Sequence, residues 1–268
     1  MARLPSLFVS HGAPTFALEP GLAGPRLRAL GKALPRPEAV LLVSPHWMTP
    51  TLRVGAASRP ETIHDFGGFG PALHAMHYPA PGHPALAQRT IDLLAAAGWS
   101  VAADTRRGLD HGAWVPLMHL YPDADVPVFQ VSLPARTDVR AAWLLGETLA
   151  PLADEGVLVV GSGSLTHNLY EFRMGATQDE AYAAEFAHWI RDAVTAGDPQ
   201  RLLRALEIAP HAQRAHPTAE HFLPLLVAAG AAAQPLPATV VEGGIVHGVL
   251  SMDGFVFGEV ASRAVAPD

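Results

Sequence analysis

Apolar and polar positions along the chain alternate between two kinds of segment. Four continuous apolar runs, each bounded by Gly, Pro or Ser, predict buried strands at Leu4–Ser10, Ala39–Ser44, Val126–Leu133 and Val157–Ser162. Four stretches with helical spacing predict helices at Pro84–Ala97, Asp138–Ala153, Asp179–Ala196 and Thr218–Ala229. The last three begin at Asp138, Asp179 and Thr218, which are residue types that cap helices. Gly243–Gly258 indicates a late strand or hairpin.

Strands that alternate with helices are typical of a mostly parallel sheet covered on both faces. No repeat, low-complexity tract or linker interrupts the pattern, so we expect a single α/β domain over residues 1–268. The Gly/Pro-rich stretch Phe66–Pro84 also carries aromatic residues, and we interpret it as an ordered loop beside an active site. Ligands of such sheets bind beyond the carboxyl ends of the strands.

Composition narrows the function classes. The 268 residues carry 18 Lys+Arg against 25 Asp+Glu, a formal net charge of −7, which argues against nucleic acid or an anionic membrane as partner. No apolar run reaches the roughly 18–20 residues of a spanning helix, and the first residues do not resemble a signal peptide. We therefore expect a cytoplasmic protein. Because cysteine is absent, any metal must be held by His, Asp or Glu.

Three of the 14 histidines follow predicted strands. His11 comes directly after the first strand, His46 after the second, and His167 shortly after Val157–Ser162. If these strands are parallel, the three side chains project from one edge of the sheet, where imidazole can bind Fe, Zn, Cu or Ni. A satisfied core or loop histidine would explain any one of them. Their shared position indicates a metal or catalytic site.

A fourth group of candidates lies near the last predicted helix. Capping by Thr218 would place Glu220 and His221 in the first helical turn, where either side chain can face a site. Glu220 also has a simpler explanation, since the helix dipole favours an acid there. His216 precedes a proline and is a weaker candidate than His221.

Two further segments are candidate walls of the site. His64 and Asp65 precede a pair of glycines that permit close backbone approach, and His111, after Asp110, lies three residues before Trp114. Either histidine can donate to substrate oxygens or orient a metal ligand. Turn structure, with the aspartates as local caps, explains both segments equally well.

Six motifs, in this order, resemble those of one known family: Ser10–Pro14, Ser44–Trp47, His64–Phe69, Leu109–Trp114, Gly163–Leu169 and Glu220–Leu225. Together they are similar to the class III extradiol ring-cleavage dioxygenases of the LigB superfamily, and within it to the 4,5-DOPA extradiol dioxygenase branch. The resemblance covers about residues 5–257. Each motif alone is weakly specific, whereas six in order are specific.

The resemblance implies a three-layer αβα fold and one non-haem metal ion, with Fe(II) expected for activity and Zn(II) able to occupy the site. By resemblance, His11 and His46 fill two metal positions. His221 is favoured as the third ligand, with Glu220 as the alternative. His167 matches the catalytic histidine and can serve as a fourth ligand.

The implied substrates are O₂ and a small aromatic diol, a catechol such as DOPA. His111 is then a second catalytic residue that assists proton transfer. The expected substrate-binding residues are polar groups and an apolar wall: His64, Asp65, Trp47, Phe66, Phe69 and Trp114. We expect a monomer or a small homo-oligomer.

Two other functions fit the same residues. A zinc-dependent hydrolase could use the same ligands to activate water, and a non-catalytic binding protein could retain the pocket. A serine hydrolase at Gly161–Ser164 is disfavoured, because the segment lacks the spacing of a nucleophile elbow. The catechol and the cleavage position stay open, with Arg173 and Arg214 as candidate partners of a substrate carboxylate.

Overall fold

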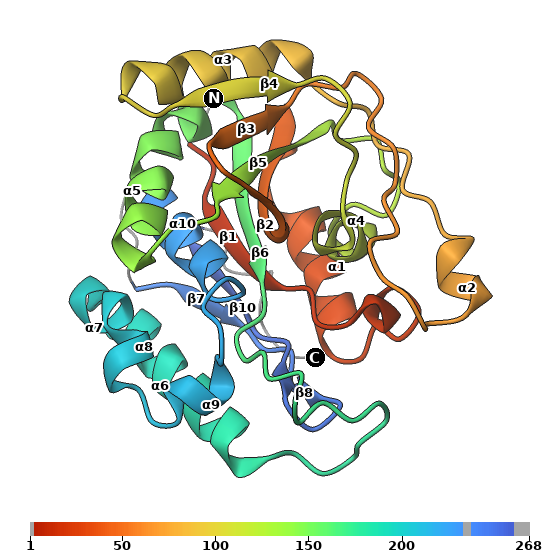
Figure 1. Cartoon of the computed structure of the whole chain (residues 1–268), viewed down its shortest axis with the longest axis vertical. Helices are drawn as coiled ribbons and strands as arrows, with labels where there is room; N and C mark the ends of the chain where they lie inside the picture. The colour runs from red at the N-terminus through yellow and green to blue at the C-terminus, as the bar shows by residue number, and fades with distance from the viewer. Residues whose placement is uncertain (1–2, 233–236, 260–268) are drawn as a thin grey trace.

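The computed structural model describes residues 3–232 and 237–259, and its centre is a mixed eight-stranded sheet (Figure 1). The strand order is β4 (Val101–Asp104), β3 (Leu52–Gly55), β5 (Val128–Pro134), β2 (Ala39–Thr49), β6 (Val157–Gly163), β1 (Ser6–Ser10), β10 (Gly254–Phe257) and β7 (Thr239–Val241). The middle strands β5, β2, β6 and β1 are parallel, as are β3 and β4. The pairs β3–β5, β1–β10 and β10–β7 are antiparallel.

Helices cover both faces of the sheet, as Figure 1 shows to the left and right of the strands. One face carries α3 (Pro84–Ala96), α5 (Val139–Leu149) and α10 (Leu223–Ala231), and the other carries α1 (Ala23–Ala33) and α4 (His111–Leu120). The helix α6 (Ala181–Thr195) packs beside β7 and β9. The shorter elements are η1 (Pro14–Ala17), α2 (Pro71–His74), η2 (Ala150–Glu155), α7 (Pro199–Leu203), α8 (Ala205–Ile208), α9 (Ala212–Ala215), β8 (Ile245–Val246) and β9 (Leu250–Ser251).

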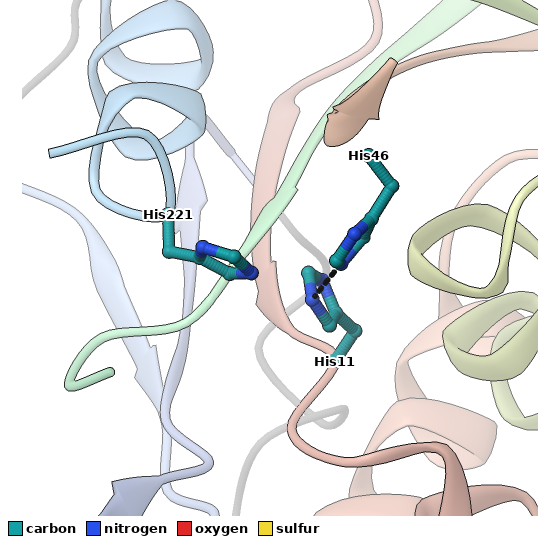
Figure 2. A group of neighbouring side chains, drawn as sticks. All are labelled: His11, His46 and His221. Carbon is teal, nitrogen blue, oxygen red and sulfur yellow. Dashed lines mark hydrogen bonds between the residues drawn. The ribbon is translucent and has the colours of Figure 1, made fainter. Parts of the chain in front are cut away.

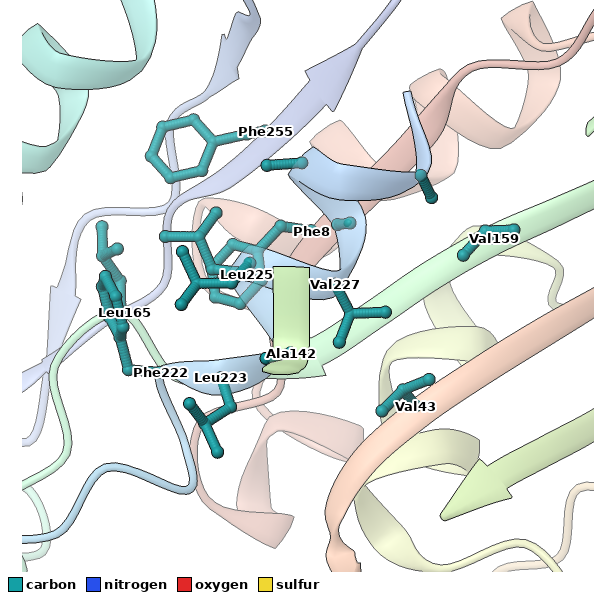
Figure 3. Packing of buried hydrophobic residues seen from close by; sticks show 14 of the residues in the cluster. Phe8, Val43, Ala142, Val159, Leu165, Phe222, Leu223, Leu225, Val227 and Phe255 are labelled. Carbon is teal, nitrogen blue, oxygen red and sulfur yellow. The ribbon is translucent and has the colours of Figure 1, made fainter. Parts of the chain in front are cut away.

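Alternation along the buried strands produces two cores. Leu41 and Val43 of β2 belong to the core on the α5 and α10 side, and Val40 and Leu42 belong to the core on the α1 and α4 side. Figure 3 shows the first core, where strand residues such as Phe8 meet α10. Continuous apolar runs are what a sheet buried on both faces requires. The predicted three-layer α/β fold is confirmed.

The predicted strands and helices are present, with some changes at their ends. β2 continues to Thr49, past an irregular register between Val43 and Met48, so that His46 lies inside the strand rather than after it. The helix predicted over residues 138–153 ends at Leu149 and continues as the 3₁₀ helix η2. Gly243–Gly258 forms the β8–β9 hairpin and β10.

One of the three predicted caps is confirmed and two are wrong. The Asp138 carboxylate accepts the N–H of Ala141 at 2.8 Å, whereas α6 begins at Ala181 without a cap from Asp179. Thr218 donates to Glu220 instead. The helix α10 starts at Leu223–Pro224, because proline is favoured in a first turn. Glu220 and His221 therefore lie in the turn before the helix, not in its first turn.

Several elements carry no clear sequence pattern. The helix α4 is almost entirely buried and contains Pro116, so it lacks the polar face that reveals an amphipathic helix. β3 and β4 have four residues each.

Among the described helices, none has the length and apolar character needed to cross a bilayer. That residues 1–268 form one catalytic domain stays a prediction, and residues 1–2, 233–236 and 260–268 lie outside the described part.

Candidate metal centre

Three histidines from distant segments meet at the carboxyl end of the central strands. His11 follows β1, His46 lies in the last part of β2, and His221 lies in the turn before α10. Figure 2 shows their rings pointing toward one another. The Nε2 atoms of His11 and His46 are 3.2 Å apart, and the ligand atoms of all three lie within 4.8 Å of one another.

Two glycines of β6 allow the turn with His221 to approach so closely. A Cβ on Gly161 would overlap the carbonyl of Pro224, and a Cβ on Gly163 would overlap the carbonyl of His221. A hydrogen bond of 3.0 Å from the N–H of Ser164 to the carbonyl of His221 joins the end of β6 to this turn. The Gly161–Ser164 segment, which sequence reasoning disfavoured as a serine nucleophile, thus positions the third histidine.

Hydrogen bonds assign the tautomers of two of these rings. The Ser162 hydroxyl donates to the carbonyl of Gly112, so its oxygen accepts from Nδ1–H of His11 at 3.0 Å and leaves Nε2 of His11 unprotonated. His221 donates Nδ1–H to the Glu220 carboxylate at 3.1 Å. Its Nε2 is buried and has no hydrogen-bond partner among the described residues. Acceptors of this kind orient metal-binding histidines.

Burial keeps the three rings neutral. Desolvation and the neighbouring imidazoles hold the pKa of His11 and of His221 well below the ordinary value of 6.5. The pKa of His46 is lowered to about 4, chiefly by burial. Only neutral imidazole binds a metal. Three convergent neutral nitrogens are suitable ligands for a divalent transition metal ion. One of them, Nε2 of His221, is buried without a hydrogen-bond partner among the described residues.

His167 and Glu220 lie directly beside this group. The rings of His167 and His221 stack at 3.4 Å with an interplanar angle of 9°. Burial lowers the pKa of His167 to about 4, while the charge of Glu220 acts in the opposite direction. The ligand atoms of Glu220, His167 and His221 lie within 4.8 Å of one another. The structure thus brings His221 together with His11 and His46, while Glu220 contacts the far nitrogen of His221.

His111 and Asp65 form a second pair at the site. Asp65 Oδ1 accepts both the backbone N–H and Nδ1–H of His111, at 2.9 and 3.0 Å. Burial opposes the ionisation of Asp65, but the hydrogen bonds from His111 prevail and lower the pKa of Asp65 to about 2. The rings of His46 and His111 are 4.0 Å apart. Asp65 therefore orients His111 with Nε2 free, next to the three-histidine group.

The expected substrate wall is only partly exposed. Phe66 meets the ring of His111 edge-on at 5.7 Å, and His64 lies 5.8 Å from Phe66. The indole of Trp114 has no exposed surface and supports His64 from behind. Trp47 is nearly buried beneath the guanidinium of Arg107. Of the predicted substrate-binding residues, His64, Asp65, Phe66 and Phe69 keep exposed surface, and the ring of Phe69 meets that of Phe66 edge-on at 5.7 Å.

The proposed carboxylate partner Arg214 is engaged elsewhere. Its guanidinium makes two hydrogen bonds to Glu171, at 2.8 and 2.6 Å, and a third to Glu180. Its carbonyl accepts from Asn168, which follows the candidate catalytic histidine. Arg214 is therefore already paired with acidic residues of the 171–180 segment, and its role as partner of a substrate carboxylate stays a prediction.

Sequence reasoning did not find the residues behind the ring of His46. Asp110 was considered as a local cap, but its side chain makes no capping hydrogen bond and instead binds Arg107 and Gln130. Gln130 sits in a strand and carries no motif. The preceding Asp of an Asp–His pair was the single available signal.

Relatives cover nearly all of the chain. Residues 20–254 match the family model described as the catalytic LigB subunit of aromatic ring-opening dioxygenase. A Beta vulgaris protein named 4,5-DOPA dioxygenase extradiol is 40% identical over 259 residues, which are 94% of this chain and 96% of that protein. A protein of the same name from Escherichia coli K12 is 40% identical over 253 residues, 93% of each chain.

A solved structure agrees with the fold. The crystal structure of an uncharacterized protein from Escherichia coli K12 aligns with a TM-score of 0.79 and 33% identity, covering 96% of this chain and 100% of that one. The similarities do not favour the hydrolase or the non-catalytic alternative. The sequence motifs, the fold and the relatives agree, and the chain belongs to the LigB family of aromatic ring-opening dioxygenases as an extradiol ring-cleaving enzyme.

Proposed function

We propose that the protein binds one divalent metal ion through Nε2 of His11, His46 and His221, with Fe(II) in the active form, and uses O₂ to cleave a small catechol such as DOPA. The observation that carries this proposal is the convergence of three neutral imidazoles, including the buried Nε2 of His221, which has no hydrogen-bond partner among the described residues. Relatives that are 37–40% identical and bear the name 4,5-DOPA dioxygenase extradiol support the substrate class.

A bound Fe(II) would supply coordination positions for the catechol oxygens and O₂, and the electron transfer between them. The protein supplies binding, orientation and proton transfer. With one nitrogen of His11 and of His221 committed to Ser162 and Glu220, these rings are fixed as ligands. A fixed constellation of this kind is what a productive geometry requires.

His167 is the proposed acid–base residue. Its lowered pKa of about 4 keeps the ring neutral at pH 7, so one nitrogen can accept the proton of a catechol hydroxyl and later return it. Stacking on His221 holds the ring parallel to a ligand. If His167 instead serves as a fourth ligand, this nitrogen binds the metal ion. Another group must then accept the proton of the catechol.

His111 is the proposed second proton carrier. Its Nδ1–H is fixed on Asp65, which leaves Nε2 to receive a proton or a substrate hydrogen bond. His64 donates Nε2–H to the carbonyl of Met76, so its Nδ1 can accept from a substrate group. Phe66 lies between these two histidines and offers an apolar edge to the catechol ring.

The test is anaerobic reconstitution of the purified protein with Fe(II), followed by oxygen uptake and visible spectra with DOPA and a panel of simple catechols. We expect stoichiometric oxygen uptake and a new yellow, pH-sensitive absorbance. Zn(II)-loaded protein is the control, because Zn(II) suits the same ligands but has no redox chemistry. One bound Fe(II) per chain without oxygen uptake on any catechol would overturn the proposal.

The remaining expectations concern the setting of the enzyme. We propose a cytoplasmic protein, since the chain has a formal net charge of −7 and no cysteine. A monomer or a small homo-oligomer is the expected state. Sedimentation of the purified protein tests the oligomeric state. A stable assembly larger than a tetramer would contradict this expectation.

A further inference from the structure

A buried carboxylate and the ring of His46 border the same glycine, Gly112. The Asp110 side chain is completely buried. Its Oδ2 accepts from Nη2 of Arg107 at 2.8 Å and from Nε2 of Gln130 at 2.9 Å. Gln130 also accepts the backbone N–H of Asp110 at 3.2 Å. One oxygen of the carboxylate is thus bound by both a guanidinium and an amide.

The other oxygen of this carboxylate is not used by the described residues. Asp110 Oδ1 is buried and lacks a hydrogen-bond partner among them. Both this oxygen and the ring edge of His46 border the α-carbon of Gly112, since a Cβ there would lie 3.2 Å from Oδ1 and 3.0 Å from Cδ2 of His46. A buried acceptor without a hydrogen bond is costly, and Arg107 and Gln130 satisfy only the other oxygen of this carboxylate.

Arg107 ties the carboxylate to the same histidine. Besides its bond to Asp110, the guanidinium donates to the carbonyl of His46 at 3.2 Å, and it lies over the ring of Trp47 at 5.0 Å. Arg107, Asp110 and Gln130 therefore form one unit that borders both the backbone and the ring of His46.

The charges of the three-histidine site call for such a group. A facial site with two histidines and one carboxylate carries one negative charge in its ligands, whereas His11, His46 and His221 carry none. Negative charge on nearby groups that are not ligands would therefore stabilise a divalent cation there. Asp65 and Glu220 are partly exposed and screened by water. Asp110 is the completely buried carboxylate beside the site, where charge acts most strongly.

We propose that Asp110 is the buried counter-charge of the metal ion, held beside His46 by Arg107 and Gln130. This inference rests on the proposed function of the three histidines as ligands. Asp110 is a positioning and charge-compensating residue, not a ligand. It raises the affinity of the neutral imidazoles for a divalent cation, and the removal of its charge alone weakens binding.

The test measures the affinity of the metal-free protein for Co²⁺ by visible absorption and for Zn²⁺ by calorimetry, without substrate. We expect Asp110→Asn, which retains shape and one acceptor, to bind both ions about 10–100-fold more weakly, as is typical when groups behind metal ligands are lost. Arg107→Gln removes the bond to His46 but leaves the negative charge of Asp110 uncompensated. We therefore expect it to bind at least as tightly as the wild type.

A merely structural role predicts a different pattern. If the unit only holds His46 in place, Arg107→Gln disrupts it as much as Asp110→Asn, and both variants lose affinity together. Equal loss, or unchanged affinity in Asp110→Asn, overturns the inference while the metal centre stands. Wild-type protein that binds neither ion overturns the proposed metal centre itself. If Asp110→Asn does not fold by circular dichroism, Arg107→Gln still decides, since a tenfold loss there contradicts the inference.

Discussion

The close approach of Gly163 to the backbone of His221 gives a sharp test of how His221 is positioned. In Gly163→Ala, the new Cβ would overlap the carbonyl oxygen of His221, and the wall on its other side is Phe8, whose ring would lie 3.2 Å from it. The same carbonyl accepts the N–H of Ser164. The change therefore acts on the backbone that carries the third histidine, with no change to any side chain of the metal centre.

The size of the effect follows from the overlap. An ordinary van der Waals contact between a Cβ and a neighbouring atom begins at 3.4 Å. Restoring that distance between the new Cβ and the His221 carbonyl moves the His221 backbone by roughly 1 Å, a displacement that lowers activity at a catalytic site about 100-fold. Metal–ligand distances tolerate only about 0.2 Å. We expect Co²⁺ affinity and kcat/KM each to fall about 100-fold, or about 2.7 kcal/mol. Overpacking should also lower the free energy of unfolding by about 1–3 kcal/mol.

Gly230→Ala is the matched control. Its Cβ would overlap the carbonyl oxygen of Trp143 in α5 to nearly the same extent, but at the end of α10 away from His221. It should lose similar stability to urea while binding Co²⁺ normally. If Gly163→Ala binds Co²⁺ as tightly as Gly230→Ala, the close approach of β6 does not set the position of the third ligand, and the reasoning fails.

Four further predictions concern single side chains. His221→Ala should abolish stoichiometric metal in the purified protein, whereas Glu220→Gln should retain it with about 10–100-fold weaker affinity; metal retained in the first and lost in the second would make Glu220 the ligand. His167→Gln should keep its metal while kcat falls about 10²–10⁴-fold, and loss of metal as well would indicate a fourth ligand. Burial lowers the pKa of His216 to about 4 from 6.5, so the unfolded chain binds more protons between these values and stability to urea should fall as the pH decreases through that window. His216→Gln should reduce this dependence by about 1.4 kcal/mol per pH unit, and an unchanged slope would mean that His216 is protonated in the fold.

Sequence reasoning located the strand-end histidines because their signal is local. A continuous apolar run followed by Ser-His or Ser-Pro-His specifies both the strand and the edge at which its side chain emerges. His46 lies within β2 rather than after it, yet the parallel neighbours still carry it to the same edge as His11. The parallel direction of the strands, rather than the residue at which each strand ends, therefore determines where these histidines lie.

The choice between Glu220 and His221 needed tertiary structure. The conformation of the backbone decides which of the two adjacent side chains faces His11 and His46. Pro224 and the contact with Gly163 set that conformation. Neither contact is visible in the local pattern. The same holds for α4, whose buried, apolar sequence conceals the helix that begins at His111. Sequence could name the chemical groups of the site but not assign their nearest neighbours.

The hydrogen bonds orient three of these rings in the same way. Each donates Nδ1–H to a fixed acceptor and keeps its lone pair on Nε2: His11 to Ser162, His221 to Glu220 and His111 to Asp65. His167 stacks against His221, the proposed third ligand, and its ring makes no such bond among the described residues. Metal binding and proton transfer would compete for the same lone pair if one ring did both, so a site that needs the two functions together requires separate imidazoles for each.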